Sequence, residues 1–237
     1  MIVNLISAVA VVFIAATIFL NYFIVVQVGP TCGFYAVAYA VSRLQCTGIR
    51  SMVYKLLRAS MNDALTNVGE IFDVNIFERL EDYLNGISIT VWSVNSKQQF
   101  ERWVTRKDCI VIFPCMVNKV PHYRVCLPFD NTRYAIVDSI FLQKNFPTKI
   151  VSKNSVFADF QMVATEKVFS WSMFYDRRVC CNISQRIACL LKNVNAYFYG
   201  VRIAHLTQKA IKLNRSELYN KETILNMKNQ IVVISKK

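Results

Sequence analysis

The first 26 residues are apolar or uncharged throughout, and they contain no Asp, Glu, Lys, Arg or His. At about 1.5 Å per helical residue, residues 2–20 alone would extend about 28 Å, close to the thickness of the bilayer hydrocarbon. Asn21 and Tyr22 follow, and both suit the membrane interface. The pattern predicts one transmembrane anchor over residues 1–22, followed by an extended segment over residues 23–26.

A cleaved signal peptide is the rival interpretation of this segment. Such a peptide carries a basic start, a shorter apolar run and a small-residue cleavage site, and the segment lacks these features. Lys and Arg are absent before the apolar run and follow it at Arg43, Arg50, Lys55 and Arg58. By the positive-inside tendency, we expect a single-pass membrane protein whose C-terminal side faces the cytosol or nucleoplasm.

Beyond the anchor, the spacing of apolar residues changes from helical to strand-like. Helices are predicted over residues 32–45, 51–65, 71–86 and 96–106. Gly86 suits the position just after a helix, and Ser96 suits an N-cap. Strands are predicted over residues 87–94, 109–117, 122–128 and 133–139, with a turn at "FDNT". Helices followed by an antiparallel sheet indicate the α+β class.

Charge divides the remaining chain. Residues 176–237 carry 12 Lys and Arg against 3 Asp and Glu, which is +9 of the formal +13. We therefore expect an anchor over residues 1–22, a domain over residues 23–175 and a basic, mainly helical region over residues 176–237. The basic region suits anionic lipid, nucleic acid or an acidic protein, and it also suits a solvated helical surface. No helix-turn-helix, RRM or zinc-finger pattern supports specific nucleic-acid binding.

The eight cysteines show no disulfide framework, in keeping with a reducing compartment. Cys180, Cys181, Cys189 and His205 lack zinc-finger spacing, and neither a P-loop nor a dinucleotide-binding motif is present. We therefore expect no cofactor and no metal.

Cys32 is the first candidate for chemistry, because it stands at the predicted start of a helix. The positive end of a helix dipole favours a thiolate, and Gly33 is expected to keep its surroundings open. A packed structural cysteine is the alternative. A cysteine nucleophile needs a base, and His122 is the main candidate, since His205 has no motif around it.

Asp138 is the expected partner of His122, because a carboxylate can orient an imidazole. If residues 129–131 form the loop of a hairpin, paired positions sum to 260 and His122 lies opposite Asp138. A two-residue loop would give 261 and break this pairing, and Asp138 would then be an ordinary residue ending a strand. Arg124 shares the face of His122, where a cation would lower the pKa of the ring and compete for Asp138.

Gln27 completes the set of candidate residues. Its side-chain amide, with the backbone N–H of Cys32, would form an oxyanion hole. The alternative is a polar residue that marks the membrane exit.

The order Gln27, Cys32, His122, Asp138 resembles the papain-like cysteine peptidase superfamily. "QVGPTCGFYAVAYA" and "PHYRVCLPFDNTRYAIVDS" are similar to motifs of the branch that holds the bacteriocin-processing peptidases and the actin maturation protease. The resemblance covers residues 23–175 and implies a papain-like fold. It makes Cys32 the nucleophile, His122 the general base, Asp138 the orienting group and Gln27 the oxyanion donor. The cathepsin-type Cys-Gly-Ser/Ala-Cys-Trp signature is absent, and Ser139 stands where bacterial relatives often have Pro.

The layout of the whole chain also resembles a membrane protein family of baculoviruses and nudiviruses that is associated with nucleocapsid envelopment and host actin. Two functions follow from these resemblances. One is a membrane-anchored viral cysteine peptidase that cleaves a cytosolic or nucleoplasmic polypeptide. The other is a catalytically silent membrane protein that uses the fold in virion assembly or envelopment. The implied partners are membrane lipid and a protein substrate or partner, with actin and nucleocapsid protein as candidates.

Overall fold

The computed structural model describes residues 24–25, 27, 30–117, 120–139, 142–143, 148–163, 168–172, 202–203 and 205–237. The anchor predicted over residues 1–22 lies outside these ranges. Within them, no helix is both long and apolar enough to cross a bilayer.

In the described part of the chain, a group of helices precedes most of the strands. The helical elements are α2 (Cys32–Gln45), α3 (Ile49–Asn62), α4 (Ile76–Arg79), the 3₁₀ helix η1 (Leu80–Tyr83), α5 (Lys97–Val104), α6 (Lys153–Gln161) and α9 (Arg215–Leu218). The strands are β1 (Ile24–Val25), β2 (Ile87–Ser93), β3 (Cys109–Val117), β4 (Val120–Pro128), β5 (Arg133–Asp138), β6 (Leu142–Gln143), β7 (Lys149–Ser152), β8 (Val168–Ser170), β9 (Glu222–Ile224) and β10 (Gln230–Lys236).

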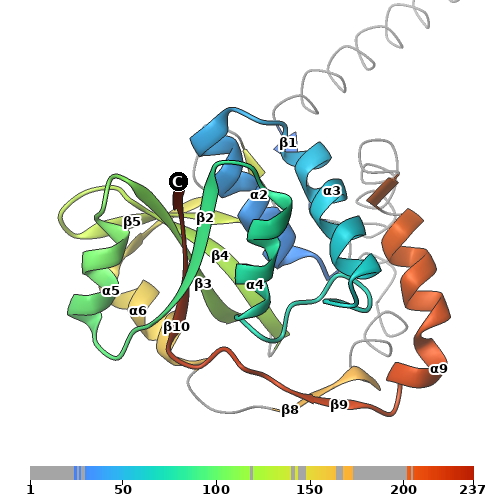
Figure 1. The fold of residues 1–237 in the computed structure, drawn as a ribbon. Helices are drawn as coiled ribbons and strands as arrows, with labels where there is room; N and C mark the ends of the chain where they lie inside the picture. The colour runs from blue at the N-terminus through green and yellow to red at the C-terminus, as the bar shows by residue number, and fades with distance from the viewer. Residues whose placement is uncertain are drawn as a thin grey trace, which may run out of the picture.

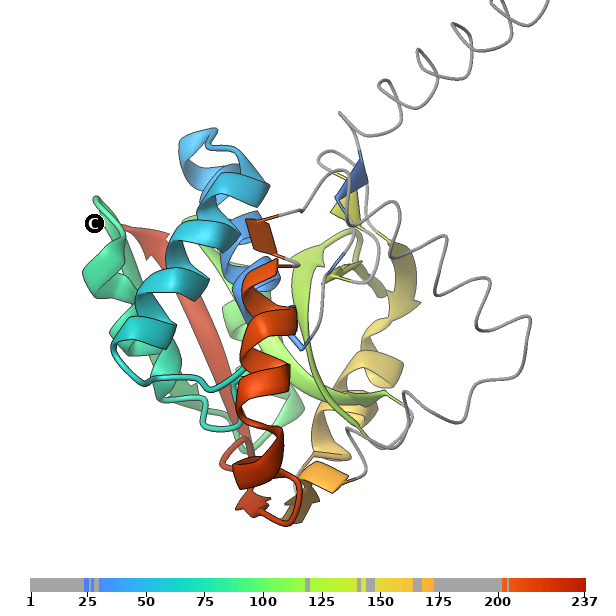
Figure 2. The ribbon, with the colours of Figure 1, turned by 90° about the vertical axis from the view of Figure 1, so that its right-hand side faces the viewer.

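A six-stranded sheet in the order β2-β10-β3-β4-β5-β7 forms the centre of the molecule, and its neighbouring strands pair antiparallel. The α+β class with an antiparallel sheet is therefore confirmed. Figure 1 shows α2 and α3 on one side of this sheet and α5 and α6 on the other. Figure 2 shows the molecule from the side that α3 covers.

Side chains on alternating positions of β3 fill two separate cores. Ile112 packs in the core that α2 and α3 cover, whereas Val111 and Phe113 pack in the core beneath α5 and α6. Successive side chains of a strand point to opposite faces. The unbroken apolar run in β3 thus results from burial on both faces of the sheet.

The C-terminal strand β10 lies inside this sheet, between β2 and β3. The sequence predicts a basic, mainly helical region from residue 176. Its described part is helical over residues 205–213 and in α9, but residues 230–236 form a sheet strand. The β-branched run "IVVI" favours a strand. The boundary at residue 175 therefore does not separate the sheet from the rest of the chain.

The helix predicted over residues 71–86 is shorter than expected. It begins at Ile76 as α4, continues as η1 and ends at Tyr83. Gly86 has a φ of +66° but lies in the turn before β2, so it is not the residue that ends the helix. In contrast, Ser96 caps α5 as predicted, accepting a 3.2 Å hydrogen bond from the backbone N–H of Gln99.

Candidate active site

The register of the β4–β5 hairpin places Arg124 opposite Asp138. Paired positions sum to 262, so the predicted sum of 260 and the direct opposition of His122 and Asp138 are wrong. Asp130 explains the difference, because its carboxylate accepts hydrogen bonds from the backbone N–H groups of Thr132 and Arg133. This turn makes the connection longer than three residues. A shift of two positions keeps every side chain on its face, so His122 and Asp138 are diagonal neighbours.

His122 and Asp138 nevertheless meet. His122 Nε2 lies 2.8 Å from Asp138 Oδ1, and both side chains are about 8% exposed. The second carboxylate oxygen, Oδ2, accepts a 2.8 Å hydrogen bond from Arg124 Nε. The backbone N–H of Asp138 donates to Thr148 Oγ1 at 2.8 Å. Asp138 is thus held at its backbone and at both carboxylate oxygens.

Cys32 is the first residue of α2, as predicted. Cys32 lies close enough to His122 to help raise the pKa of the ring, and His122 in turn contacts Asp138. Cys32 is partly exposed, whereas the preceding Thr31 is fully buried. Cys32 thus stands in the first turn of a fourteen-residue helix, the end at which the helix dipole is positive.

Gly33 has a different role from the one predicted. It is buried, and a Cβ at this position would lie 2.8 Å from Ile71 Cδ1 and 3.1 Å from Phe77 Cζ. The missing side chain therefore allows the start of α2 to pack tightly against these two residues. Gly33 fixes the position of Cys32 by close packing instead of keeping its surroundings open.

The pKa of His122 is raised from 6.5 to about 9. Burial is the largest influence and favours the neutral ring, but hydrogen bonds to Asp138 and Cys32 and their negative charges outweigh it. The net shift is upward, although a cation such as Arg124 is expected to act in the opposite direction. Its expected competition for Asp138 is observed, since the carboxylate is shared. A protonated ring at neutral pH suits an imidazolium–thiolate pair.

Gln27 is tied to the residue that follows Asp138. Its Oε1 accepts a 2.6 Å hydrogen bond from Ser139 Oγ, and its backbone N–H donates to the Ser139 carbonyl at 3.1 Å. Just before it, β1 pairs with β6, which follows β5 in the chain. The extended lead-in predicted for residues 23–26 is confirmed at residues 24–25.

The other described cysteines differ from Cys32. Cys115 lies opposite His122 across the β3–β4 ladder and is buried, which raises its pKa to about 12. Burial also raises the pKa of Cys126. His205 is exposed. Among the residues that the structure describes, no group of His, Cys, Asp and Glu is arranged to hold a metal ion.

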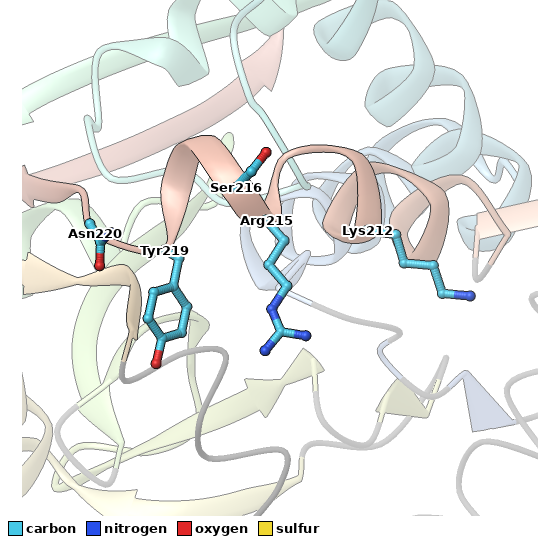
Figure 3. Close-up of a pocket in the computed structure, with 5 residues that line it drawn as sticks. All are labelled: Lys212, Arg215, Ser216, Tyr219 and Asn220. Carbon is cyan, nitrogen blue, oxygen red and sulfur yellow. The ribbon is translucent and has the colours of Figure 1, made fainter.

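A surface hollow lies at a different place, along the basic C-terminal helical segment. Figure 3 shows its lining residues, none of which belongs to the Cys32 site: Lys212, Arg215, Ser216, Tyr219 and Asn220. Arg215 stacks over the ring of Tyr219, with 5.9 Å between the guanidinium carbon and the ring centre. The hollow belongs to the basic surface predicted from the charge distribution.

Residues 23–124 match the sequence model of a family described as actin maturation protease-like, C-terminal domain. The match covers less than half of the chain. It includes Gln27, Cys32 and His122 and ends before Asp138. No curated protein matches the chain. The family match supports the resemblance to the actin maturation protease branch and points to a peptidase-like domain.

Proposed function

We propose that this protein is a cysteine peptidase in which Cys32 is the nucleophile, His122 the acid–base group and Asp138 the orienting carboxylate. The observation that carries the proposal is the place of His122, whose Nε2 lies 2.8 Å from Asp138 Oδ1 and whose pKa is raised in part by the nearby Cys32. Three residues far apart in the sequence meet at a helix start and two neighbouring strands. Nucleophile, base and orienting group in contact are what cysteine-based acyl transfer requires.

In the proposed reaction, the Cys32 thiolate attacks the scissile carbonyl carbon, and a C–S bond forms as negative charge moves to the oxygen. His122 then donates its proton to the leaving amine as the C–N bond breaks. Water attacks the resulting thioester while His122 takes one of its protons, and cleavage of the C–S bond restores the thiolate. Because the Asp138 carboxylate binds Nε2 of His122, the other ring nitrogen, Nδ1, is the one that exchanges a proton with the Cys32 sulfur in this reaction.

Gln27 is the proposed oxyanion donor, together with the backbone N–H of Cys32. Backbone N–H groups in the first turn of a helix have no partner within the helix. The Ser139 hydroxyl binds Gln27 Oε1, which turns the Nε2 end of the amide away from Ser139. An amide held in this way can donate to developing charge without reorganising.

We further propose that the site acts close to a membrane. The uncharged sequence of residues 1–22 ends one residue before β1, and the chain reaches Gln27 only two residues after β1. Substrates would be membrane-proximal polypeptides or flexible termini, with actin and nucleocapsid protein as candidates from the resemblances. The exposed cations Lys209, Lys212 and Arg215 suit contact with anionic headgroups. Phosphatidylserine nanodiscs should then slow hydrogen exchange over residues 205–219, and equal exchange in phosphatidylcholine nanodiscs would refute this contact.

A second candidate is a catalytically silent viral membrane protein that uses the fold in assembly or envelopment. The observation in its favour is the Arg124–Asp138 ion pair, which takes one oxygen of the orienting carboxylate. A structural ion pair of this kind would stabilise a binding module without any need for catalysis.

Site-resolved alkylation with iodoacetamide separates the two candidates. In the full-length protein in detergent, Cys32 should react faster than the exposed Cys46, and His122→Ala should abolish that advantage. Incubation with 4-nitrophenyl acetate should also leave an acetyl group on Cys32 that mass spectrometry detects. Equal reactivity of Cys32 in wild type and His122→Ala, without acetylation, would refute the peptidase and favour the silent protein.

A further inference from the structure

Arg124 is the charged residue nearest to Asp138 across the β4–β5 ladder. Directly opposed side chains in an antiparallel pair have Cβ atoms about 4.5–5.5 Å apart, whereas diagonal neighbours are about 7–8 Å apart. The observed register gives the short distance to Arg124 and the long one to His122. Asp138 can therefore reach His122 only if its carboxylate is directed along the strand toward the ring.

The contacts of Arg124 provide this direction. Its Nε donates to Asp138 Oδ2 at 2.8 Å, while Oδ1 lies 2.8 Å from His122 Nε2. Its Nη1 lies 3.4 Å from Asp159 Oδ2 on α6. The Arg124 side chain is only 12% exposed, so the guanidinium is held between the sheet and the helix that covers it.

We propose that Arg124 is a positioning residue for the peptidase site, holding the Asp138 carboxylate so that Oδ1 stays on His122 while Asp159 anchors the guanidinium. The inference rests on the proposed function for its catalytic consequence. It adds to that function a sequence of contacts from α6 to the nucleophile: Asp159, Arg124, Asp138, His122, Cys32. Formal charges alternate along it when Cys32 and His122 form an ion pair, so each group has an oppositely charged neighbour.

The geometry also explains why an arginine suits this position. The guanidinium is planar and carries several donors in a fixed arrangement, so Nε and Nη1 can bind two different carboxylates together. A lysine ammonium could keep the charge beside Asp138, but it is a single point of contact on a flexible stem. Arg124→Lys should therefore preserve part of the effect, and Arg124→Met should remove it.

The test reads the tautomer of the His122 ring, which does not depend on catalysis. The chain has two histidines, so His205→Gln leaves His122 as the single labelled ring in the full-length protein. At alkaline pH, where the ring is neutral, imidazole ¹⁵N shifts should report the Nε2–H tautomer fixed by Asp138. Arg124→Met should give a mixture of tautomers, and Arg124→Lys should restore most of the Nε2–H form.

Kinetics supply the second measurement. Arg124→Met should slow acetylation of Cys32 by 4-nitrophenyl acetate about tenfold through kcat, with KM little changed, because the loss is one of orientation. Asp159→Asn is the milder control, since it leaves the Arg124–Asp138 contact in place. If Arg124→Met does not fold, Arg124→Leu replaces it, because its side chain is also uncharged and cannot donate a hydrogen bond.

A pure Nε2–H tautomer in the folded Met or Leu variant would overturn the positioning role. The peptidase proposal and the positioning role of Arg124 are tested by different results. If Cys32 of the wild type shows no His122-dependent reactivity, the peptidase proposal fails. The His122 tautomer in the Arg124 variants still decides whether Arg124 positions Asp138.

Discussion

Ser139 Oγ donates a 2.6 Å hydrogen bond to Gln27 Oε1, joining residues 112 positions apart in the sequence. Ser139 directly follows Asp138, so the end of β5 contacts both the base side and the oxyanion side of the proposed site. The residue noted as a departure from bacterial relatives is therefore the one that fixes the orientation of the amide.

Ser139→Ala should lower the kcat for acetylation of Cys32 by about tenfold, because the Gln27 amide loses the contact that directs its Nε2 group. This loss is smaller than the 10²–10³ typical of deleting an oxyanion donor outright. Ser139→Thr keeps the hydroxyl and serves as the control. In a Gln27→Ala background the serine substitution should have no further effect. Additive losses in that double-mutant cycle would contradict the coupling.

The pKa of His122 predicts different pH profiles for two kinds of substrate. Anilide hydrolysis needs a proton on the leaving amine, so its rate should fall as pH rises through about 9 and the ring becomes neutral. A 4-nitrophenyl ester has a good leaving group, and its rate should not fall over the same range. Initial rates with a peptide 4-nitroanilide and the ester provide the comparison. Parallel decline of both rates would show that His122 is not the proton donor.

The same raised pKa predicts a pH dependence of stability. Because the folded value lies above the ordinary 6.5, the protonated ring stabilises the fold fully below pH 6.5. That contribution should disappear as pH rises through about 9. Unfolding by urea should show a decreasing free energy between these values in wild type and a flatter dependence in His122→Gln. An identical slope in both proteins would argue against the raised pKa.

Gly33→Ala should destabilise the protein by about 1–3 kcal/mol, the usual cost of overfilling a packed site. The added methyl group would meet Ile71 at 2.8 Å and Phe77 at 3.1 Å. Gly48→Ala is a matched control, since a Cβ there would approach the exposed Ser51 hydroxyl at 3.1 Å. Thermal and urea unfolding measure both changes. Equal tolerance of the two substitutions would mean that the start of α2 is not tightly packed.

The pairing of β1 with β6 predicts how the chain tolerates insertions on either side of β1. A Gly/Ser linker after Tyr22 should leave folding and Cys32 alkylation intact, because it precedes the Ile24–Val25 strand. The same linker after Val26 should impair alkylation, because it separates β1 from the Gln27–Ser139 contacts. Site-resolved alkylation and thermal unfolding test the pair of insertions. If both proteins react like wild type, the strand does not position Gln27.

The sequence predicted those features that depend on local patterns. The bounds of α2 and β3, the Ser96 cap and the common face of His122 and Asp138 all followed from periodicity and residue type. The pairing register of β4 and β5 could not be predicted in this way, because the length of their connection depends on hydrogen bonds made by one aspartate in the turn. Arg124 therefore appeared only as a competitor for Asp138, although it is the residue directly opposite.

Other features depended on contacts between distant segments. The β-branched run within residues 230–236 indicates a strand, but no local pattern could place that strand between β2 and β3. The contact between Ser139 and Gln27 likewise requires β1 to reach β6. Periodicity identifies an element and its buried face, whereas its neighbours are set by the path of the whole chain.

The central position of β10 has a consequence for how the protein is made. A ribosome synthesises β2 and β3 long before the strand that lies between them, so β2 lacks its ladder partner until residues 230–236 have emerged. The helix that begins at Cys32 and the strand that carries His122 are also synthesised before β10. The six-stranded sheet behind these two residues is therefore completed later than the elements that hold them.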